Sequence, residues 1–268
     1  MSIRALWGLL IILPLATSAA DIPDSASIGP RFHHETSYDR DGFKGKSISH
    51  GEAIPLFKEY PGSEKTKLPM PEESGTSLVA ALNARHSVRS FADRAITLPQ
   101  LSRLLQSADG ASHGTDNYPM RTAPSGGALY PVDMYVAASN VEGLQAGLYH
   151  FKPHDSSLEL VEAGDFGDRL HGAAFEQGCV GSSPITIVLT ARFERSTKKY
   201  ADRGYRYTYM EGGAICQNIY LQAGALQLGT VAVGAFNDEA LNKLLGIDGL
   251  SEAALLIMPV GYPAGGGE

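Results

Sequence analysis

The segment 85–91 gathers groups that could bind a phosphate. It contains Arg85, His86, Ser87 and Arg89. A phosphate needs several N–H and O–H donors together with positive charge, which arginine guanidinium groups supply well. The same residues could instead form a solvated basic helix end, where cations complement the helix dipole. Taken alone, they favour this second interpretation.

Segment 121–131 could approach a planar ligand closely. It contains Pro124, Ser125, Gly126 and Gly127, directly before a strand pattern. Adjacent glycines let the backbone come close to a flat ring, and a serine hydroxyl can donate to a ring carbonyl. The alternative, a plain loop that leads into a strand, is the commoner fate of such a sequence.

Two further segments could act on the reacting atoms. In segment 229–236, a backbone N–H beside Val233 and Gly234 could point at the reactive position of a bound ring, although this signal alone is very weak. Lys199 and Tyr200 are adjacent, and both side-chain types can transfer protons. The alternative for this pair is an exposed, charged helix start.

The residue pattern predicts the elements that position these segments. Apolar residues at helical spacing predict helices, and Thr97 with Gln100 predicts a capping box before one of them. Apolar runs bounded by turn residues predict strands. The predicted helices are 77–85, 98–108, 166–175, 210–228 and 238–245, the last capped by Asn237; the predicted strands are 132–138, 147–152, 158–161, 185–191, 230–235 and 254–260.

These elements alternate without a strict strand–helix–strand rhythm, which favours an α+β fold over a doubly wound sheet. The continuous β-branched run 185–191 predicts a central strand. Helix 210–228 is apolar almost all round, which is typical of a buried helix. Segment 113–127 has no periodicity and is predicted to be a loop.

Composition and charge narrow the function classes. The chain has 268 residues, of which 43% are hydrophobic and 19% charged, as expected for one large globular domain with ancillary segments. A net charge of −7 argues against a nucleic-acid partner, because such proteins usually present a basic face. Cys179 and Cys216 lack metal-ligand spacing, so no metal site is predicted, and a bridge between them is not favoured.

The first twenty residues have the pattern of a signal peptide. An apolar run at 5–15 follows Arg4, and small residues lead to a cleavage point after Ala19 or Ala20. We therefore expect export to the periplasm, and no later segment is long and apolar enough to span a membrane. The predicted organisation is 1–20 signal peptide, 21–74 Pro-rich irregular arm, 75–264 folded domain and 265–268 tail.

Read together, the four segments resemble the nitroreductase superfamily and, within it, the SagB/ThcOx-type dehydrogenase branch. Arg-His-Ser-Val-Arg at 85–89 is similar to the superfamily's opening flavin motif. Ala-Pro-Ser-Gly-Gly-Ala-Leu-Tyr-Pro at 123–131 is similar to the branch's Pro-Ser-Ala-Gly-Ala-Leu-Tyr-Pro. The branch's most distinctive run resembles Lys199-Tyr200, Arg-Gly-Tyr-Arg-Tyr at 203–207, Glu211 and Gln217-Asn218. Each motif is weak singly, but four in register are a strong signal.

The resemblance implies a nitroreductase-like α+β fold, with a mostly antiparallel central sheet flanked by helices and a long buried helix. It also implies a homodimer with FMN at the subunit interface. The implied phosphate and ribityl contacts are Arg85, His86, Ser87 and Arg89. Pro124, Ser125, Gly126 and Gly127 would lie near the isoalloxazine, and Val233 and Gly234 beside its N5. Lys199 and Tyr200 would act as base and acid while hydride passes to FMN.

Two departures from the family pattern stand out. Tyr262 occupies a position where the family often has a basic residue that contacts the phosphate, so Arg85 and Arg89 would carry more of that contact. Export is also unusual, because peptide-modifying members work in the cytoplasm.

The resulting hypothesis is an FMN-dependent oxidoreductase that oxidises a small or peptide-derived substrate. One alternative is an NAD(P)H-dependent nitro or quinone reductase. The other is a flavin-binding protein that has lost catalysis, against which the presence of Lys199 and Tyr200 argues.

Overall fold

The computed structural model describes residues 28–38, 54–71, 75–115 and 118–265. It divides into two units, residues 1–45 and 46–268. The first unit contains the helix α1 (Ile28–Glu35). The predicted signal peptide and its cleavage point lie outside the described residues, as does most of the predicted tail.

The second unit is built on a seven-stranded sheet in which every neighbouring pair is antiparallel. In spatial order its strands are β1 (Lys65–Lys67), β8 (Ser157–Ala163), β7 (Gly147–Lys152), β5 (Val132–Ala138), β9 (Ile185–Ala191), β11 (Ala253–Gly261) and β10 (Gly229–Thr230). Two small pairs accompany it: β2 (Ile96–Thr97) with β6 (Val141–Glu142), and β3 (Ala111–Thr115) with β4 (Tyr118–Arg121).

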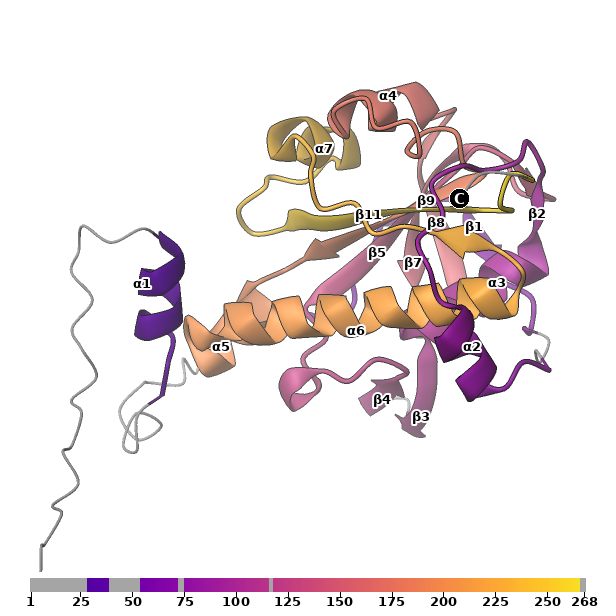
Figure 1. The fold of residues 1–268 in the computed structure, drawn as a ribbon. Coiled ribbons are helices and arrows are strands. Elements are labelled where there is room, and N and C mark those ends of the chain that lie inside the picture. The colour runs from indigo at the N-terminus through magenta and orange to yellow at the C-terminus, as the bar shows by residue number, and fades with distance from the viewer. Residues whose placement is uncertain (1–27, 39–53, 72–74, 116–117, 266–268) are drawn as a thin grey trace, which may run out of the picture. The chain divides into compact units, whose positions relative to one another are not determined.

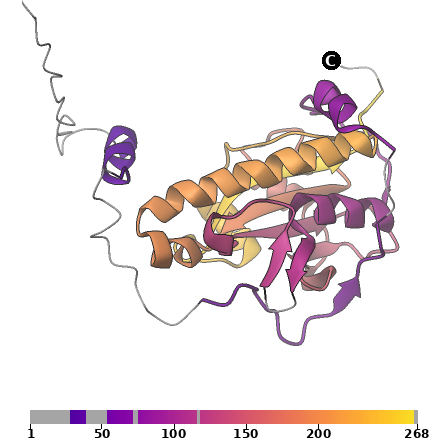
Figure 2. The same ribbon diagram turned by 90° about the horizontal axis from the view of Figure 1, so that it is seen from below.

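Helices cover both faces of this sheet (Figure 1). One face carries α2 (Leu78–Ala84), α3 (Leu98–Asp109) and α6 (Arg203–Ala225), and the other carries α4 (Gly167–Ala173) and α7 (Asp238–Leu245). Figure 2 shows α3 and α6 side by side. Alternate residues of β5 enter two separate cores, with Met134 and Val136 on the α6 side and Tyr135 and Ala137 on the other. These features confirm the predicted α+β fold with an antiparallel sheet between helices.

The long helix α6 is confirmed, but it begins at Arg203, seven residues before the predicted start. Its first turns lack an apolar pattern, because Gly204 packs against the backbone of α5 (Glu194–Tyr200). Burial follows one stripe: Gly204, Thr208, Glu211, Gly212, Ile215, Ile219 and Ala223. Tyr209 and Met210 are 51% and 65% exposed, so the described part of the chain does not cover these two residues on the other side of the helix.

Three regions differ from the prediction. The expected loop 113–127 contains part of the β3–β4 hairpin, whose strands carry too few apolar residues to show alternation. The strand predicted at 230–235 is reduced to β10 and one bridge between Val233 and Ile257. The expected irregular arm includes α1 and β1.

Local capping follows the sequence closely. Both hydrogen bonds of the predicted capping box are present, since the Thr97 hydroxyl accepts from Gln100 N and Thr97 N donates to Gln100 Oε1. Asn237 caps α7 by accepting from Ala240 N. Cys179 and Cys216 are both free thiols. Among the described helices, none combines the length and apolarity that crossing a bilayer requires.

Candidate active site

Tyr220 of α6 joins two of the predicted segments. Its hydroxyl lies 3.0 Å from Ser87 Oγ and accepts a hydrogen bond from Ala232 N at 2.9 Å. The backbone N–H of Val88 donates to the carbonyl of Thr230 at 2.9 Å, which ties the same two segments together a second time. The sequence did not single out Tyr220, because Ser87 lies 133 positions away along the chain. Segments 85–91 and 229–236 therefore form one cluster.

The basic groups of this cluster face outward. The Arg85 guanidinium lies over the Tyr220 ring, with Cζ 5.2 Å from the ring centroid. His86 is exposed, and its Nδ1–H donates to the Ala84 carbonyl. Arg85 and Arg89 are exposed, and no carboxylate of the described residues pairs with either of them. Two guanidinium groups are thus available to an anion.

Val233 and Gly234 follow Ala232 along the chain, and they differ in whether their backbone is available to a ligand. The N–H of Val233 already donates to the carbonyl of Ile257 at 2.9 Å, so it is not available to a ligand. Gly234 is exposed, and a Cβ at this position would meet no atom within 4 Å.

The second cluster forms where the turn at 125–130 meets α5. A Cβ built on Gly127 would lie 2.5 Å from the Tyr200 hydroxyl and 2.8 Å from Lys199 Nζ. Gly127 also has a φ of +70°, a conformation that side chains other than glycine disfavour. A side chain at this position would therefore displace Lys199 and Tyr200. The structure brings the predicted ring-binding glycine and the predicted proton-transfer pair into one place.

Neighbouring groups fix this turn. Ser125 Oγ accepts from Tyr130 N at 2.8 Å, and a Cβ on Gly126 would lie 3.4 Å from the side chain of Tyr207. Tyr200 and Tyr207 meet edge to face, with their ring centroids 4.9 Å apart. Pro124 and Gly127 are exposed, so the outer side of the turn is open to a ligand.

Arg195 anchors α5, the helix that carries Lys199 and Tyr200. Its side chain is almost fully buried; Nη1 donates to the Tyr130 carbonyl at 2.9 Å and to both oxygens of Asp133 at 3.1 and 3.2 Å. Burial alone would raise the pKa of Asp133, but Arg195 and His150 hold that pKa below its ordinary value. The ion pair thus keeps α5 and the end of the turn in a fixed relationship.

Two buried carboxyl groups, those of Asp109 and Glu211, lie near the same turn. Asp109 pairs with Arg121 at 2.6 Å, and Glu211 of α6 accepts from Val132 N at 3.4 Å. Burial raises the pKa of Glu211 to about 8 and the pKa of Asp109 to about 7. The sequence pattern placed Glu211 within the run that resembles the branch but assigned it no role, and it did not single out Asp109.

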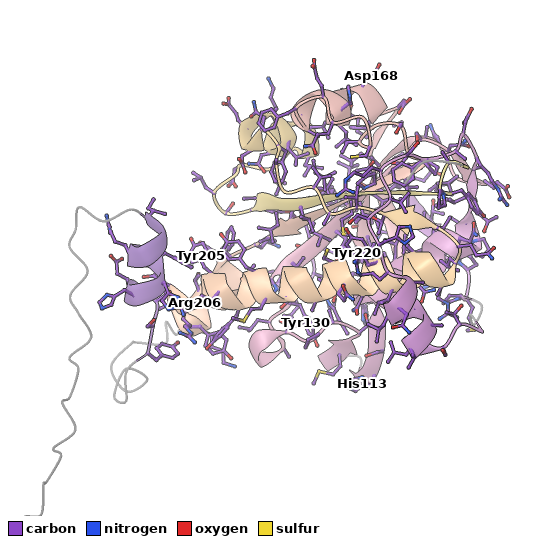
Figure 3. The ribbon with its side chains drawn as sticks, in the orientation of Figure 1. His113, Tyr130, Asp168, Tyr205, Arg206 and Tyr220 are labelled. Atoms are coloured by element: carbon purple, nitrogen blue, oxygen red, sulfur yellow. The ribbon has the colours of Figure 1, made fainter. Side chains whose placement is uncertain are left out.

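The two clusters lie at opposite ends of α6. Figure 3 shows Tyr205 and Arg206 at the end next to α5, and Tyr220 towards the other end. Arg203 and Tyr220 are seventeen residues apart, which corresponds to about 25 Å at 1.5 Å per helical residue. Within one chain, therefore, the phosphate-binding candidates do not lie together with Lys199 and Tyr200.

Tyr262, which directly follows β11, makes a cation–π contact with Arg94. The guanidinium of Arg94 stacks on its ring, with Cζ 3.7 Å from the centroid, and its hydroxyl bonds to Gln100. A positive charge therefore lies beside the position where the sequence lacks the expected basic residue.

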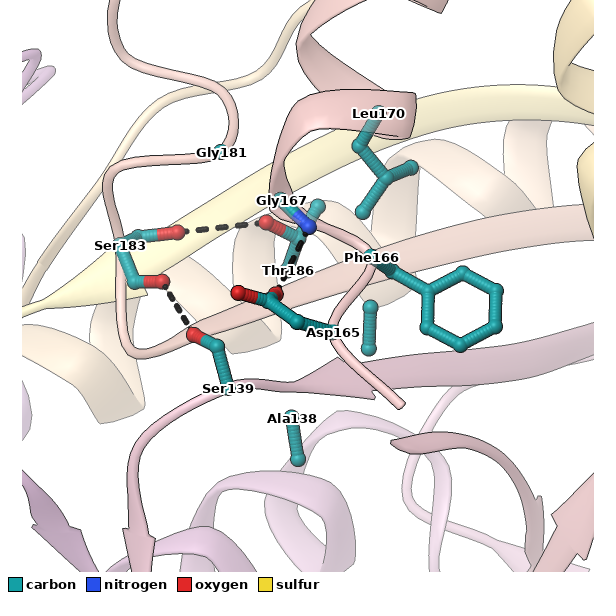
Figure 4. Close-up of a pocket in the computed structure, with 10 residues that line it drawn as sticks. Ala138, Ser139, Asp165, Phe166, Gly167, Leu170, Gly181, Ser183 and Thr186 are labelled. Carbon is teal, nitrogen blue, oxygen red and sulfur yellow. Dashed lines mark hydrogen bonds between the residues drawn. The ribbon is translucent and has the colours of Figure 1, made fainter. Parts of the chain in front are cut away.

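The described residues line several hollows. The small cavity in Figure 4, near Asp165 and Ser183, has a volume of about 10 Å³, enough for roughly one water molecule. Two open hollows of about 350 and 270 Å³ are larger; the first is lined by residues such as Lys58, Arg192 and Glu252, and the second by residues such as Leu78, Asn218 and Leu221. Among the described residues, no group of three or more His, Cys, Asp or Glu side chains could hold a metal ion.

Comparison with known proteins identifies the family. The model of the nitroreductase family matches residues 82–262. The chain belongs to the nitroreductase family. Nitroreductases generally bind a flavin, and the family makes this chain an oxidoreductase. MJ1384 of Methanocaldococcus jannaschii, itself named as a nitroreductase, is 38% identical over 195 residues, which cover 73% of this chain and 96% of that protein.

A second relative indicates the branch within the nitroreductases. The microcin B17-processing protein McbC of Escherichia coli is 32% identical over 144 residues; the match covers 51% of this chain and 52% of McbC. The chain thus spans about half the length of this relative. Similarity to a peptide-processing protein confirms the predicted SagB-like branch.

Solved nitroreductase structures confirm the fold. A crystal structure of a protein from Ralstonia eutropha JMP134, described as a nitroreductase, superimposes with a TM-score of 0.66 at 28% identity. The superposition covers 81% of this chain and 97% of the other.

Proposed function

We propose that this nitroreductase is an FMN-dependent dehydrogenase that oxidises a small or peptide-derived substrate. The observation that carries the proposal is the meeting of Gly127 with Lys199 and Tyr200. A backbone turn that admits no side chain, open on its outer side, lies directly against two groups that can transfer protons. A flat ring laid on this turn would have both groups at its edge.

The residues present fit FMN. The exposed guanidinium groups of Arg85 and Arg89, with Ser87 beside them, form a donor set suited to a phosphate. Gly126 and Gly127 have no side chain to keep a ring away from the backbone, and no atom lies within 4 Å of the position that a Cβ on Gly234 would take. His86, Pro124 and Ser125 complete the proposed cofactor-binding set. Val233, also expected there, is 5% exposed and its N–H donates to the Ile257 carbonyl, so we assign it no direct contact with the ligand.

The distance between the two clusters supports a homodimer with a composite site. The phosphate-binding cluster of one subunit would combine with the turn and the Lys199–Tyr200 pair of its partner. Apolar side chains exposed near both ends of α6 supply surface for such a contact: Leu78 and Val79 are each 67% exposed, and Met210 is 65% exposed. Exposed apolar groups of this kind commonly mark an interface.

Bound FMN would supply a two-electron acceptor for hydride. Lys199 would take the proton that leaves the substrate carbon or nitrogen. Tyr200 would donate its hydroxyl hydrogen bond to the atom on which negative charge develops. Gly127 would let the ring approach both groups, and Arg195 would hold their helix in place.

The similarity to McbC, whose name describes processing of microcin B17, supports the proposal of a peptide-derived substrate. The open outer side of the turn supports a substrate that reaches in from outside the subunit. The names of MJ1384 and of the Ralstonia protein favour a second candidate, an NAD(P)H-dependent reductase of nitro or quinone compounds. Export, with cleavage after Ala19 or Ala20, remains part of the proposal. It is tested by the mass of the N-terminal peptide of the protein recovered from a bacterial periplasm.

Purification tests the proposal directly. We expect a yellow protein that binds one FMN per subunit and oxidises an azoline-containing peptide. In the double variant Lys199→Ala, Tyr200→Phe, FMN binding should persist while peptide oxidation is lost. A colourless protein that takes up no FMN would contradict the proposal. Turnover of NADH with a nitroaromatic compound, unaffected in the double variant, would favour the reductase.

A further inference from the structure

One part of the sheet face opposite α6 is polar. Strand pairing places four residues in one row across β1, β8, β7 and β5: Lys65, Glu159, His150 and Tyr135. Glu159, His150 and Tyr135 are each at most 1% exposed. The rest of this face packs apolar side chains into a core cluster that includes Ala137, Leu148, Val188 and Ile257. Burial of polar and charged groups is unfavourable unless they are paired, so the polar part of the face requires a cover that satisfies them.

Residues 58–60 provide part of this cover. The Lys58 ammonium donates to the Tyr135 hydroxyl at 2.5 Å and to Glu252 Oε2 at 2.6 Å. The hydroxyls of Tyr60 and Tyr135 lie 2.7 Å apart. Because two groups of the sheet hold its ammonium, Lys58 presents a fixed positive charge at the surface of the polar layer, where its side chain is 20% exposed.

The open hollow of about 350 Å³ adjoins Lys58. Its volume lies within the range of about 300–1,000 Å³ that is usual for sites that bind small molecules. The lining combines the half-buried ring of Phe57 with two cationic side chains, those of Lys58 and Arg192. Arg192 directly follows β9, and Glu252 on the same lining directly precedes β11. Three separate parts of the chain thus bring an apolar surface and positive charge into one hollow.

Arg192 is the charged group of this lining that the described residues leave without a partner. Glu252 accepts from Lys58, and the carboxylate of Glu59 pairs with Lys152, so neither acid is left to neutralise Arg192. Within the described ranges, the Arg192 guanidinium makes no ion pair and no hydrogen bond. It is also half-buried. A guanidinium that has lost part of its hydration without gaining a partner favours an anion, and its two parallel N–H donors match a carboxylate.

We propose that this hollow is a binding site for a carboxylate carried on a small apolar group. Arg192 binds the carboxylate through its two parallel N–H donors, Lys58 adds a second positive charge, and Phe57 packs against the apolar part. A free organic acid and the carboxyl-terminal residue of a peptide with an apolar side chain offer the same chemistry. The hollow shares no residue with the two clusters proposed to hold FMN, so this site does not depend on the proposed function.

An NMR titration of the isotope-labelled full chain tests the site. The first probe is benzoate, which replaces chloride at constant ionic strength so that general screening does not change. We expect saturable shifts in the backbone amides of Phe57, Arg192 and Ser251, which line the hollow. Benzamide, which has nearly the same shape but no charge, should give none. The second probe is a blocked tripeptide that ends in a free phenylalanine carboxylate. Its binding extends the site to peptide chain ends, whereas binding of benzoate alone assigns the site to free acids.

Arg192→Gln removes the charge while keeping a hydrogen-bond donor. Because no described residue pairs with this side chain, the variant should fold normally, and it should bind benzoate at least about tenfold more weakly. Arg169→Gln is the control, since Arg169 is an exposed arginine that pairs with Glu162 and does not line the hollow; it should bind benzoate as the wild type does.

Three results would overturn the inference. Benzoate could give no saturable shift in the three amides, benzamide could shift them equally, or Arg192→Gln could bind benzoate as tightly as the wild type. Shifts confined to segment 85–91 would also overturn it, because the anion would then lie on the proposed phosphate cluster instead.

Discussion

The hydroxyl of Tyr220 lies 3.0 Å from Ser87 Oγ, although the two residues are 133 positions apart in the chain. This contact fixes segment 85–91 on the end of α6. The same hydroxyl accepts a hydrogen bond from the N–H of Ala232. This oxygen, together with the hydrogen bond from Val88 N to the Thr230 carbonyl, sets the relative position of the two segments that we propose to hold the flavin.

Tyr220→Phe should therefore lower both the stability of the protein and its affinity for FMN. The variant loses two hydrogen bonds but keeps the ring beneath Arg85, so we expect a loss of about 1–3 kcal/mol in the free energy of unfolding. Urea denaturation measures this loss, and FMN titration should show weaker binding. Tyr209→Phe, which removes an exposed hydroxyl from the same helix, serves as the control. Equal stability of the two variants would contradict the role of Tyr220.

Gly127→Ala should abolish turnover without unfolding the protein. The added Cβ would lie 2.5 Å from the Tyr200 hydroxyl and must displace it. A displacement of about 1 Å at a catalytic group can reduce the rate about 100-fold. Gly143→Ala is a matched control, because Gly143 has a φ of +78° but open space around its Cβ. Both variants should lose similar stability, of roughly 1–2 kcal/mol. Only Gly127→Ala should lose peptide oxidation, and equal turnover would exclude the proposed site.

Gly229→Ala should loosen the first cluster. A Cβ on Gly229 would lie 2.5 Å from Val88 Cβ, so the opening segment could no longer pair closely with β10. Overpacking of this kind costs about 1–3 kcal/mol. We expect a lower melting temperature and weaker FMN binding. Riboflavin, which lacks the phosphate, should bind with little change if the damage is confined to the phosphate cluster.

The free energy of unfolding should depend on pH through the carboxyl group of Asp133. Arg195 and His150 hold its pKa below the ordinary value, so the folded state binds this proton less readily than the unfolded chain does. The resulting stabilisation is fully present above about pH 4 and is lost as the pH falls through the lowered pKa. In Asp133→Asn, Arg195 remains buried without its partner, which costs about 3–5 kcal/mol near pH 7. The difference from the wild type, followed by thermal denaturation, should shrink below pH 4; a constant difference would contradict the ion pair's role.

The sequence predicted those elements whose signals are local. Thr97 with Gln100, Asn237 and the apolar run of β9 each depend on neighbours within a few residues, and all three are found as expected. The β3–β4 hairpin was missed because its strands lack an apolar face. The first turns of α6 were missed because Gly204 packs by backbone contact with α5 rather than by side-chain burial.

The candidate site was predicted in its residues but not in its arrangement. Gly127, Lys199 and Tyr200 were named separately, and only the fold shows that they touch. Tyr220 contacts Ser87 and Glu211 contacts Val132, which lie 133 and 79 positions away in the chain, and no spacing rule predicts such partners. The separation of the two clusters along α6 likewise depends on the helix length, which the sequence pattern underestimated.

The sheet ends on each side in a very short strand: β1 has three residues and β10 has two. Long, exposed edge strands invite pairing with other chains, and short edges that carry lysines resist it. Lys65 and Lys67 of β1 cover β8, a seven-residue strand that would otherwise form the edge. A truncation that removes residues 54–71 should therefore expose the edge of β8 and cause aggregation through this edge, even if the flavin site is intact.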